Sequence, residues 1–245
     1  MMLAGKRVVV TGAGGGIGLA LVQVLGEAGA HVVACDRDGV AVQADEVVGF
    51  DIIDRDQTLQ AAGRIAEGPV DVVISNAGGT RVETLEATDP AAIDADMGLN
   101  FTGAAVFTRA LLPALRARGG AVVFVASVNA LAHYGNPAYS AAKAALVAWS
   151  RAIATEEARH GVRSNVVAPG SVHTPAWEER EARQPGIFDR VTGLYPMGRL
   201  VSPAEVAQAA LFLASPMASG ITGTVLPVDA GLSAGNRGFC DIIGA

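Results

Sequence analysis

A glycine-rich segment, residues 11–18, follows the first apolar run of the chain and precedes a long apolar helical pattern. It reads Thr-Gly-Ala-Gly-Gly-Gly-Ile-Gly, between a predicted strand at Arg7–Thr11 and a predicted helix at Ile17–Ala28. Glycines let the backbone turn tightly and approach a bound group, while the helix N-terminus offers free N–H groups to an anion. This arrangement predicts a turn that binds the phosphates of a nucleotide. A glycine-rich turn without a ligand is the alternative.

Short valine-rich runs alternate with longer helical patterns along the rest of the chain. Such alternation predicts one α/β domain over residues 1–245, a doubly wound Rossmann type whose parallel sheet has about seven strands and helices on both faces. The other expected elements are strands at His31–Cys35, Val70–Ser75, Ala121–Ala126, Arg163–Ala168 and Thr224–Val228, and helices at Thr102–Arg118 and Ala138–His160. Between Asp36 and Asp51 the chain is too short for a long helix and a strand, so we expect only a turn or two there.

Composition argues against several classes of protein. The net charge of −6, without a basic run, argues against nucleic-acid binding, which depends on phosphate neutralisation. Residues are 51% hydrophobic but lie in short runs, whereas a membrane helix needs about 20 in succession, so no membrane association is expected. The two cysteines, Cys35 and Cys240, lack metal-ligand or disulfide spacing. We therefore expect no metal site and a reducing, cytoplasmic setting.

Asp36 ends the second predicted strand, where a carboxylate can accept hydrogen bonds from the adenosine ribose and repel a 2′-phosphate. The neighbouring Arg37 could bind that phosphate instead, but the glycine turn contains no basic residue to assist it. The sequence therefore favours NAD over NADP. The alternative role of Asp36 is to begin the turn Asp36–Gly39.

Tyr139 and Lys143 are four residues apart in a predicted helix and so share one face. A tyrosine has a pKa of about 10, and a nearby cation is expected to lower it, which would make Tyr139 usable as an acid or base. The alternative is that the two residues only share one face of an ordinary amphipathic helix.

Ser127 and Asn76 follow predicted strands, at the edge where open α/β sheets bind ligands. Asn100 lies inside the helical pattern Ala91–Leu115, where asparagine needs a local reason such as a kink or a bound water.

Together these motifs resemble the short-chain dehydrogenase/reductase (SDR) family, and they occur in the same order along nearly the whole chain. The matching residues are Thr11–Gly18, Asn76–Gly78, Asn100, Ser127, Tyr139 with Lys143, Pro169–Gly170, Ile221–Gly223 and Val228–Asp229. The resemblance implies that Tyr139 is the general acid/base, that Lys143 also binds the nicotinamide ribose, and that Ser127 orients the substrate oxygen. It implies that Asn100 holds a water in the proton relay. Ser75 and Ala230 depart from the family's usual Asn and Gly and affect local packing.

The resemblance also implies a cofactor site, in which Asp51 and Ile52 flank adenine while Val172 and Thr174 meet the nicotinamide. The expected cofactor-binding residues are Gly12, Gly15, Gly16, Ile17, Gly18, Asp36, Arg37, Asp51, Ile52, Asn76, Ala77, Gly78, Tyr139, Lys143, Pro169, Gly170, Val172 and Thr174.

Substrate contacts are expected from the loop before Tyr139 and from an irregular segment at about 171–200, which is predicted to be a helical lid. The expected substrate-binding residues are Ser127, Asn129, His133, Tyr139 and Trp177, with Tyr134, Phe188 and Met197 as further candidates. The alternative for His133 is that it is an ordinary surface histidine. The alternative for the lid aromatics is that they only cover the core. The mixture of polar and aromatic side chains among these candidates suggests a small or medium substrate with an apolar body and one or two polar groups.

The sequence thus predicts an NAD-dependent oxidoreductase that interconverts a secondary alcohol and a ketone. The alternatives are an NADPH-dependent 3-oxoacyl-thioester reductase and, in another class, a non-catalytic dinucleotide-sensing or scaffold protein. The resemblance implies a homotetramer or homodimer formed through the helices Thr102–Arg118 and Ala138–His160. The apolar tail Phe239–Ile243 is expected to dock on its own or a neighbouring subunit.

Overall fold

The computed structural model describes residues 1–79 and 84–244. All its strands form one parallel sheet of seven strands in the order β3-β2-β1-β4-β5-β6-β7. The strands are β1 (Arg7–Thr11), β2 (His31–Asp36), β3 (Glu46–Gly49), β4 (Val72–Ser75), β5 (Ala121–Val125), β6 (Arg163–Pro169) and β7 (Val225–Val228). The central strands are valine-rich and buried on both faces, as a parallel sheet covered by helices requires.

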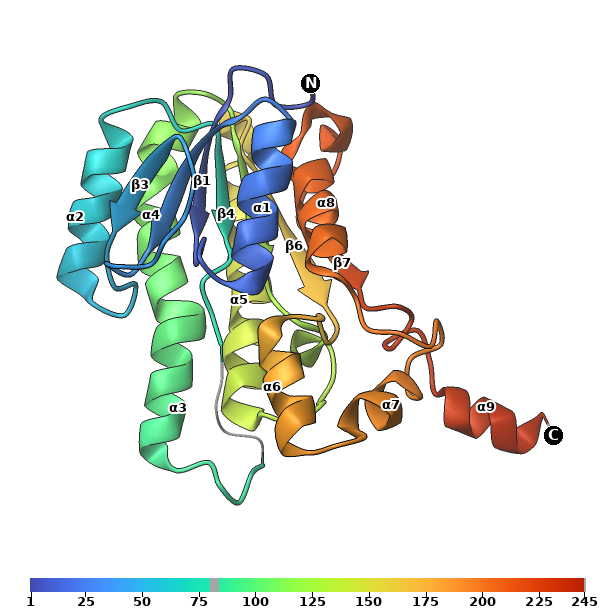
Figure 1. Cartoon of the computed structure of the whole chain (residues 1–245). Coiled ribbons are helices and arrows are strands. Elements are labelled where there is room, and N and C mark those ends of the chain that lie inside the picture. The colour runs from blue at the N-terminus through green and yellow to red at the C-terminus, as the bar shows by residue number, and fades with distance from the viewer. Residues whose placement is uncertain (80–83, 245) are drawn as a thin grey trace.

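Helices cover both faces of this sheet (Figure 1), which confirms the predicted single α/β domain of the doubly wound type. The helices are α1 (Gly16–Glu27), α2 (Arg55–Ala66), α3 (Pro90–Met97), α4 (Gly103–Arg116), α5 (Pro137–Glu156), α6 (Pro175–Arg183), α7 (Ile187–Thr192), α8 (Pro203–Ala214) and α9 (Arg237–Ile243). One core cluster joins the sheet to α1 and α8, and the other joins it to α2, α4 and α5.

The order of the strands reverses between β1 and β4, which are neighbours in the sheet. From this point the chain winds toward β3 in one direction and toward β7 in the other. The segments that follow Thr11 and Ser75 therefore leave the sheet side by side. Such a switch point is where open α/β sheets bind their ligands.

The connection from β2 to β3 contains turns and no helix, in line with the short crossover expected between Asp36 and Asp51.

The segment predicted to be a lid contains α6 and α7, and Tyr195 anchors it. The hydroxyl of Tyr195 accepts a hydrogen bond from the Ser171 N–H at 2.8 Å, and its side chain is only 1% exposed. Ala230 adopts a φ of 49°, a left-handed conformation that favours the glycine usual there.

None of the helices in the described parts of the chain combines the length and apolar character that crossing a membrane requires.

Candidate functional site

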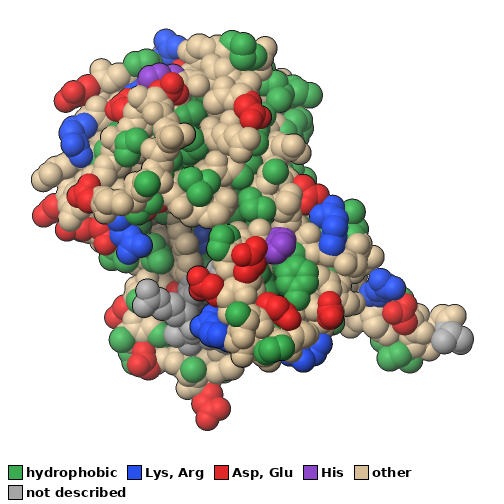
Figure 2. Space-filling view, viewed as in Figure 1, with side chains coloured by type: hydrophobic (Ala, Val, Ile, Leu, Met, Phe, Trp, Pro, Cys, Tyr) green, Lys and Arg blue, Asp and Glu red, His purple; other side chains and the backbone are tan. Residues whose placement is uncertain are grey.

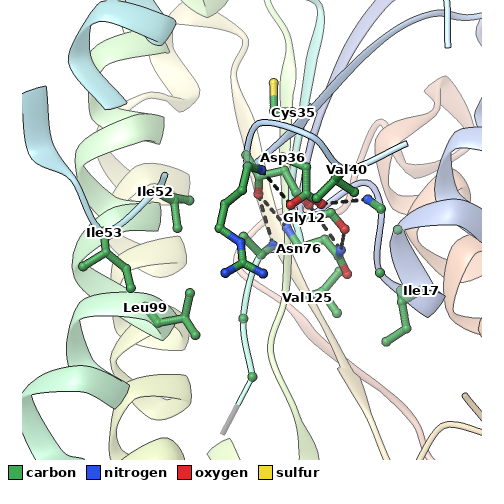
Figure 3. Close-up of a pocket in the computed structure, with 18 of the residues that line it drawn as sticks. Gly12, Ile17, Cys35, Asp36, Val40, Ile52, Ile53, Asn76, Leu99 and Val125 are labelled. Atoms are coloured by element: carbon green, nitrogen blue, oxygen red, sulfur yellow. Dashed lines mark hydrogen bonds between the residues drawn. The ribbon is translucent and has the colours of Figure 1, made fainter. Parts of the chain in front are cut away.

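A cavity of about 1020 Å³ opens at the switch point, beyond the carboxyl ends of the strands. Figure 2 shows the surface hollowed between the body of the sheet and the lower part of the molecule. Inside, Ile52, Ile53 and Leu99 lie opposite Asp36 and the glycine turn (Figure 3). The cavity is lined by all the predicted cofactor-binding residues except Pro169, Gly170 and Val172.

The glycine turn is bonded to the loop that follows β4. The side-chain amide of Asn76 donates to the carbonyl oxygens of Thr11 at 3.2 Å and Gly12 at 2.9 Å. The Thr11 hydroxyl accepts hydrogen bonds from the N–H groups of Asn76 and Ala77, each at 3.1 Å. Gly12 has a φ of 64°, and a Cβ there would lie 2.7 Å from the Cα of Ala77. Only glycine permits this approach of the two backbones.

The Asp36 carboxylate is held by backbone donors at the rim of the cavity. Its two oxygens accept hydrogen bonds from the N–H groups of Gly14 and Arg37, each at 2.8 Å. Val40 packs so close to Gly14 that a Cβ at this glycine would lie 2.1 Å from Cγ1 of Val40. Gly14 and Val40 are lining residues that were not predicted from the sequence, although the run of three glycines was a signal for Gly14.

Tyr139 and Lys143 lie one turn apart on α5, with the Lys143 Nζ 5.5 Å from the centre of the Tyr139 ring. Nζ donates to the Val125 carbonyl oxygen at 3.0 Å, and the lysine is only 3% exposed. Burial lowers the pKa of Lys143 to about 8. Burial also raises the pKa of Tyr139 to about 12. A hydrogen bond with the Ser127 side chain lowers this pKa, and the Asp96 charge raises it further.

The expected lowering of the Tyr139 pKa by Lys143 is therefore wrong for this structure, because burial of the phenol outweighs the effects that favour phenolate. At neutral pH Tyr139 is a protonated phenol and Lys143 is largely an ammonium ion. The pair can donate a proton as it stands. It can accept one only after further positive charge has stabilised the phenolate.

Asn100 occupies a π-helical turn, Gly98–Thr102, between α3 and α4. Its amide nitrogen donates to the carbonyl oxygens of Gly79 at 2.8 Å and Asp96 at 3.0 Å, and its oxygen accepts from the Gly79 N–H at 2.9 Å. This turn is the local reason for an asparagine inside the helical pattern. A Cβ on Gly78 would lie 2.7 Å from the Asn100 Oδ1 and 2.8 Å from the Lys143 Nζ. Gly78 thus allows these two side chains to lie against the loop.

Ser127 and Asn129 brace the loop before Tyr139. The Ser127 hydroxyl donates to the Asn129 Oδ1 and accepts from the Asn129 N–H, both at 3.2 Å. The amide nitrogen of Asn129 donates to the Gly135 carbonyl at 2.7 Å and to the Ser140 hydroxyl at 3.0 Å. Ser127 thus both caps the turn after β5 and lies within hydrogen-bonding reach of Tyr139.

Among the residues predicted to bind substrate, Tyr139 alone lines the described cavity. Trp177 packs inside the lid instead, 6.5 Å from the Phe188 ring and 5.3 Å from the Arg180 guanidinium. His133 is exposed on its loop, and the Asn129 amide is bonded within its own loop. Their roles in substrate binding stay predictions.

Three predicted cofactor residues, Pro169, Gly170 and Val172, do not line the described cavity. A Cβ on Gly170 would lie 3.1 Å from the Cα of Asp229 and 3.1 Å from the Tyr195 ring, and Val172 pairs with Val201. Their contact with a cofactor stays a prediction, because Thr174 and Pro175 are the residues of this segment that line the described cavity.

One wall of the cavity, which the sequence did not predict, is supplied by α3 and the π-helical turn. Its residues are Ala92, Ala95, Asp96 and Leu99. Their helical pattern gave no signal of which side would face a cavity. Cys35 also lines the cavity, but burial raises the pKa of its thiol to about 12, so it is not a nucleophile at neutral pH. In the described residues no group of His, Cys, Asp or Glu side chains could hold a metal ion.

Three comparisons place the chain among known proteins. Residues 12–233 match the family described as enoyl-(acyl carrier protein) reductase. A solved oxidoreductase from Burkholderia thailandensis, described as a member of the short chain dehydrogenase/reductase family, is 43% identical with a TM-score of 0.90, over 98% of this chain and 97% of that one.

Two relatives of known activity match almost the full length. The L-fucose dehydrogenase of Bos taurus is 38% identical, over 95% of this chain and 91% of that protein. The 3-oxoacyl-(acyl-carrier-protein) reductase of Thermotoga maritima is 35% identical, over 95% of this chain and 99% of that protein.

Proposed function

Because this chain belongs to the short-chain dehydrogenase/reductase family, we propose that it is an NAD-dependent enzyme that interconverts a secondary alcohol and a ketone. The observation that carries the proposal is that one cavity contains the glycine turn and Asp36 together with Tyr139 and Lys143. A screen of alcohols and ketones with NAD(H) and NADP(H), followed by the absorbance of the reduced nicotinamide, tests it. The absence of turnover with every pair would overturn it.

The residues at the glycine turn suit a dinucleotide. The N-terminus of α1 has no side-chain cap among the described residues, so its N–H groups are available to a phosphate. A Cβ on Gly16 would lie 2.8 Å from the Thr174 Cγ2, so this glycine keeps the lid and the turn close together. Asp36 and Asp51 lie in the lining and would bind ribose and adenine, and Lys143 lies in the same lining beside Tyr139.

In the oxidation direction the deprotonated form of Tyr139, its phenolate, accepts the hydroxyl proton of the alcohol, and in reduction the protonated phenol donates its proton to the ketone oxygen. A bound nicotinamide supplies the hydride acceptor or donor. Lys143, with a pKa of about 8, places a positive charge beside the phenol at neutral pH. The Ser127 hydroxyl, which already lowers the Tyr139 pKa by hydrogen bonding, can hold the substrate oxygen. Asn100 holds the loop at Gly78 and Gly79 against Lys143.

We propose NAD as the cofactor on the basis of Asp36. Replacement by alanine, Asp36→Ala, is expected to lower kcat/KM with NAD about 10-fold to 100-fold, since hydrogen bonds to a charged group contribute about 1.5–3 kcal/mol. The same change should raise kcat/KM with NADP, because it removes a charge that repels the 2′-phosphate. Asp38→Ala is the control, since Asp38 is exposed on the same turn and is not among the described lining residues. A wild-type enzyme that prefers NADP would contradict the assignment.

An NADPH-dependent 3-oxoacyl-thioester reductase is the second candidate function. The similarity to the Thermotoga maritima reductase supports it, and the carboxylate of Asp36 opposes it. A thioester substrate turned over with NADPH and not with NADH would establish this alternative in the screen described above.

We further propose a homo-oligomer, formed through α4 and α5, in which α9 docks on a neighbouring subunit. Figures 1 and 2 show α9 projecting away from the body of the molecule. The side chains of Phe239, Ile242 and Ile243 are 59%, 78% and 67% exposed, which is unfavourable for apolar side chains that stay in water. The tail therefore does not dock on its own subunit in this structure.

The double variant Phe239→Ala with Ile242→Ala is expected to dissociate more readily than the wild type, because it removes apolar surface from the proposed contact. Sedimentation velocity over a dilution series measures the change. Arg237→Ala, on the same helix, is the control. A wild type that sediments as a monomer, or equal dissociation of all three proteins, would argue against the docking.

A cytoplasmic location stays a prediction. The two cysteines, buried Cys35 and exposed Cys240, are free thiols, which agrees with a reducing compartment.

A further inference from the structure

The side chain of Asn129 connects the end of β5 to the first turn of α5, and the proposed proton transfer does not use it. Ser127 directly follows Ala126, which lines the cavity, and Ser140 directly follows Tyr139 on α5. Asn129 is hydrogen-bonded to the side chains of both serines. One amide therefore joins the segment that carries the Ser127 hydroxyl to the segment that carries the Tyr139 phenol.

The Asn129 amide has only one orientation that satisfies its neighbours. Its nitrogen donates to the Gly135 carbonyl oxygen at 2.7 Å and to the Ser140 hydroxyl at 3.0 Å. A carbonyl oxygen only accepts, so the NH2 group must face Gly135, and the amide oxygen faces Ser127. This oxygen lies 3.2 Å from the Ser127 Oγ. Since an amide oxygen also only accepts, Ser127 must donate the proton of that hydrogen bond.

The Ser127 hydroxyl has one proton and two lone pairs, and Asn129 determines how they are used. The proton is directed to the amide oxygen, and one lone pair accepts the Asn129 N–H at 3.2 Å. The second lone pair is left to accept from the hydroxyl of an alcohol. The bond to the amide oxygen is longer than the usual distance of about 2.8 Å between hydroxyl groups and their acceptors. Ser127 can therefore turn its proton to a substrate oxygen that gains negative charge.

The same hydrogen bonds fix the backbone at the start of α5. Gly135 and Asn136 have φ values of 88° and 50°, so two successive residues lie in the left-handed region. The Gly135 carbonyl accepts from Asn129 and from the Ser140 hydroxyl at 3.0 Å, and this hydroxyl also lies 2.9 Å from the Asn136 carbonyl oxygen. A non-glycine residue keeps such a conformation where its surroundings hold it. The network therefore fixes the chain three residues before Tyr139.

We propose that Asn129 is a positioning residue for the proton transfer, whose amide sets the direction of the Ser127 hydroxyl proton and holds Ser127 at a fixed place relative to Tyr139. The inference rests on the proposed function and adds a residue to it. Asn129 acts through Ser127 and not through a contact with the substrate. Misplacement of a reacting group by about 1 Å can lower a rate about 100-fold, so a bond that holds Ser127 in place is expected to affect kcat.

A double-mutant cycle on the full-length enzyme tests the proposal. The wild type, Asn129→Ala, Ser127→Ala and the double variant are compared in kcat at saturating NAD, with the best alcohol from the screen described above. Ser127→Ala is expected to lower kcat about 10²-fold to 10³-fold, as for other donors to a reacting oxygen. Asn129→Ala should lower it about 10-fold, the effect of one lost hydrogen bond.

The decisive comparison is the effect of Asn129→Ala when Ser127 is already alanine. It should then change kcat less than about 2-fold, because the group through which Asn129 acts is gone. A fall of about 10-fold in both backgrounds would overturn the proposal, since Asn129 would then contact the substrate itself or support the fold in general.

The KM for NAD separates positioning of Ser127 from a general defect of α5. It should stay at the wild-type value in Asn129→Ala, because Lys143 and the glycine turn keep their places in the cavity. A rise in this KM together with the loss of kcat would show a displaced helix and contradict the proposal. Leu131→Ala is the control, since Leu131 is 44% exposed on the same loop, and it should behave as the wild type.

Ser140→Ala tests the same connection if Asn129→Ala does not fold. It removes one acceptor of the Asn129 amide, and alanine is favourable in a helix. We expect kcat to fall about 3-fold to 5-fold, less than for loss of the whole amide, and only in the presence of Ser127. An equal fall in the Ser127→Ala background would overturn the proposal.

The outcomes separate this inference from the proposed function. If the wild type turns over no alcohol or ketone with either nicotinamide, the proposed function fails and the inference fails with it. If the wild type is active and Ser127→Ala lowers kcat while Asn129→Ala does not, only the role of Asn129 fails. Thermal melting and NADH binding establish that each variant is folded.

Discussion

Replacing the phenol hydroxyl in Tyr139→Phe is expected to lower kcat by about 10²-fold to 10⁴-fold, the range that a positioned acid or base contributes. The ring remains, so the packing of α5 and the position of Lys143, 5.5 Å from the ring centre, should not change. What is lost is the phenol hydroxyl that is proposed to exchange a proton with the substrate oxygen, and this hydroxyl is protonated at neutral pH. NADH affinity should be unchanged.

Steady-state turnover with the best substrate and a fluorescence titration with NADH measure the two effects separately. Tyr134→Phe is the matched control, because Tyr134 is 41% exposed on the loop before α5 and lies outside the described cavity lining. A Tyr139→Phe enzyme with full activity would remove Tyr139 from the chemistry. Loss of NADH binding in this variant would show a structural defect instead.

The second large effect is expected at Gly18, in the first turn of α1. A Cβ there would lie 2.0 Å from the Gly12 carbonyl oxygen and 2.8 Å from the Cα of Ala13, both backbone atoms. Gly18→Ala must therefore displace the glycine turn. We expect the free energy of unfolding to fall by about 1–3 kcal/mol, as for other overpacked sites. NADH binding should weaken by an order of magnitude or more, since the displaced backbone is the part proposed to meet the pyrophosphate.

Gly26, on the same helix, provides the contrast. A Cβ at this position meets nothing within 4 Å, and the backbone is helical. Gly26→Ala should raise the free energy of unfolding by about 0.5–1 kcal/mol, because alanine loses less conformational entropy than glycine in a helix. Urea unfolding and NADH titration of both variants measure the difference. Equal stability of Gly18→Ala and Gly26→Ala would contradict the close packing of the turn.

The sequence predicted the cofactor half of the cavity more completely than the substrate half. Gly12, Gly18 and Asp36 are recognisable because their roles depend on local features: a backbone without a Cβ, and a carboxylate at the end of a strand. Asn129 and Trp177 were predicted to reach the substrate from their residue types and from their places in the loop before Tyr139 and in the lid. The structure bonds the first within its own loop and packs the second against Phe188.

The charge state of Tyr139 shows a second limit. The spacing of Tyr139 and Lys143 predicts a phenol beside a cation, and the structure places them so. The sign of the net pKa shift depends on how deeply the phenol is buried and on the charge of Asp96, which comes from another helix. Neither quantity is contained in the spacing.

The glycine turn, the alternation of strands and helices, and the motif around Tyr139 determined by themselves the fold, the family and the edge of the sheet where the site lies. The motifs that indicate these properties each consist of residues a few positions apart, so they can be recognised in the sequence directly. Tertiary structure alone decided that α3 forms a wall of the cavity, that Asp96 lies in the same lining as Tyr139, and that α9 leaves its own subunit. These depend on packing between segments distant in the chain, and a helical pattern does not specify which neighbour each of its faces will meet.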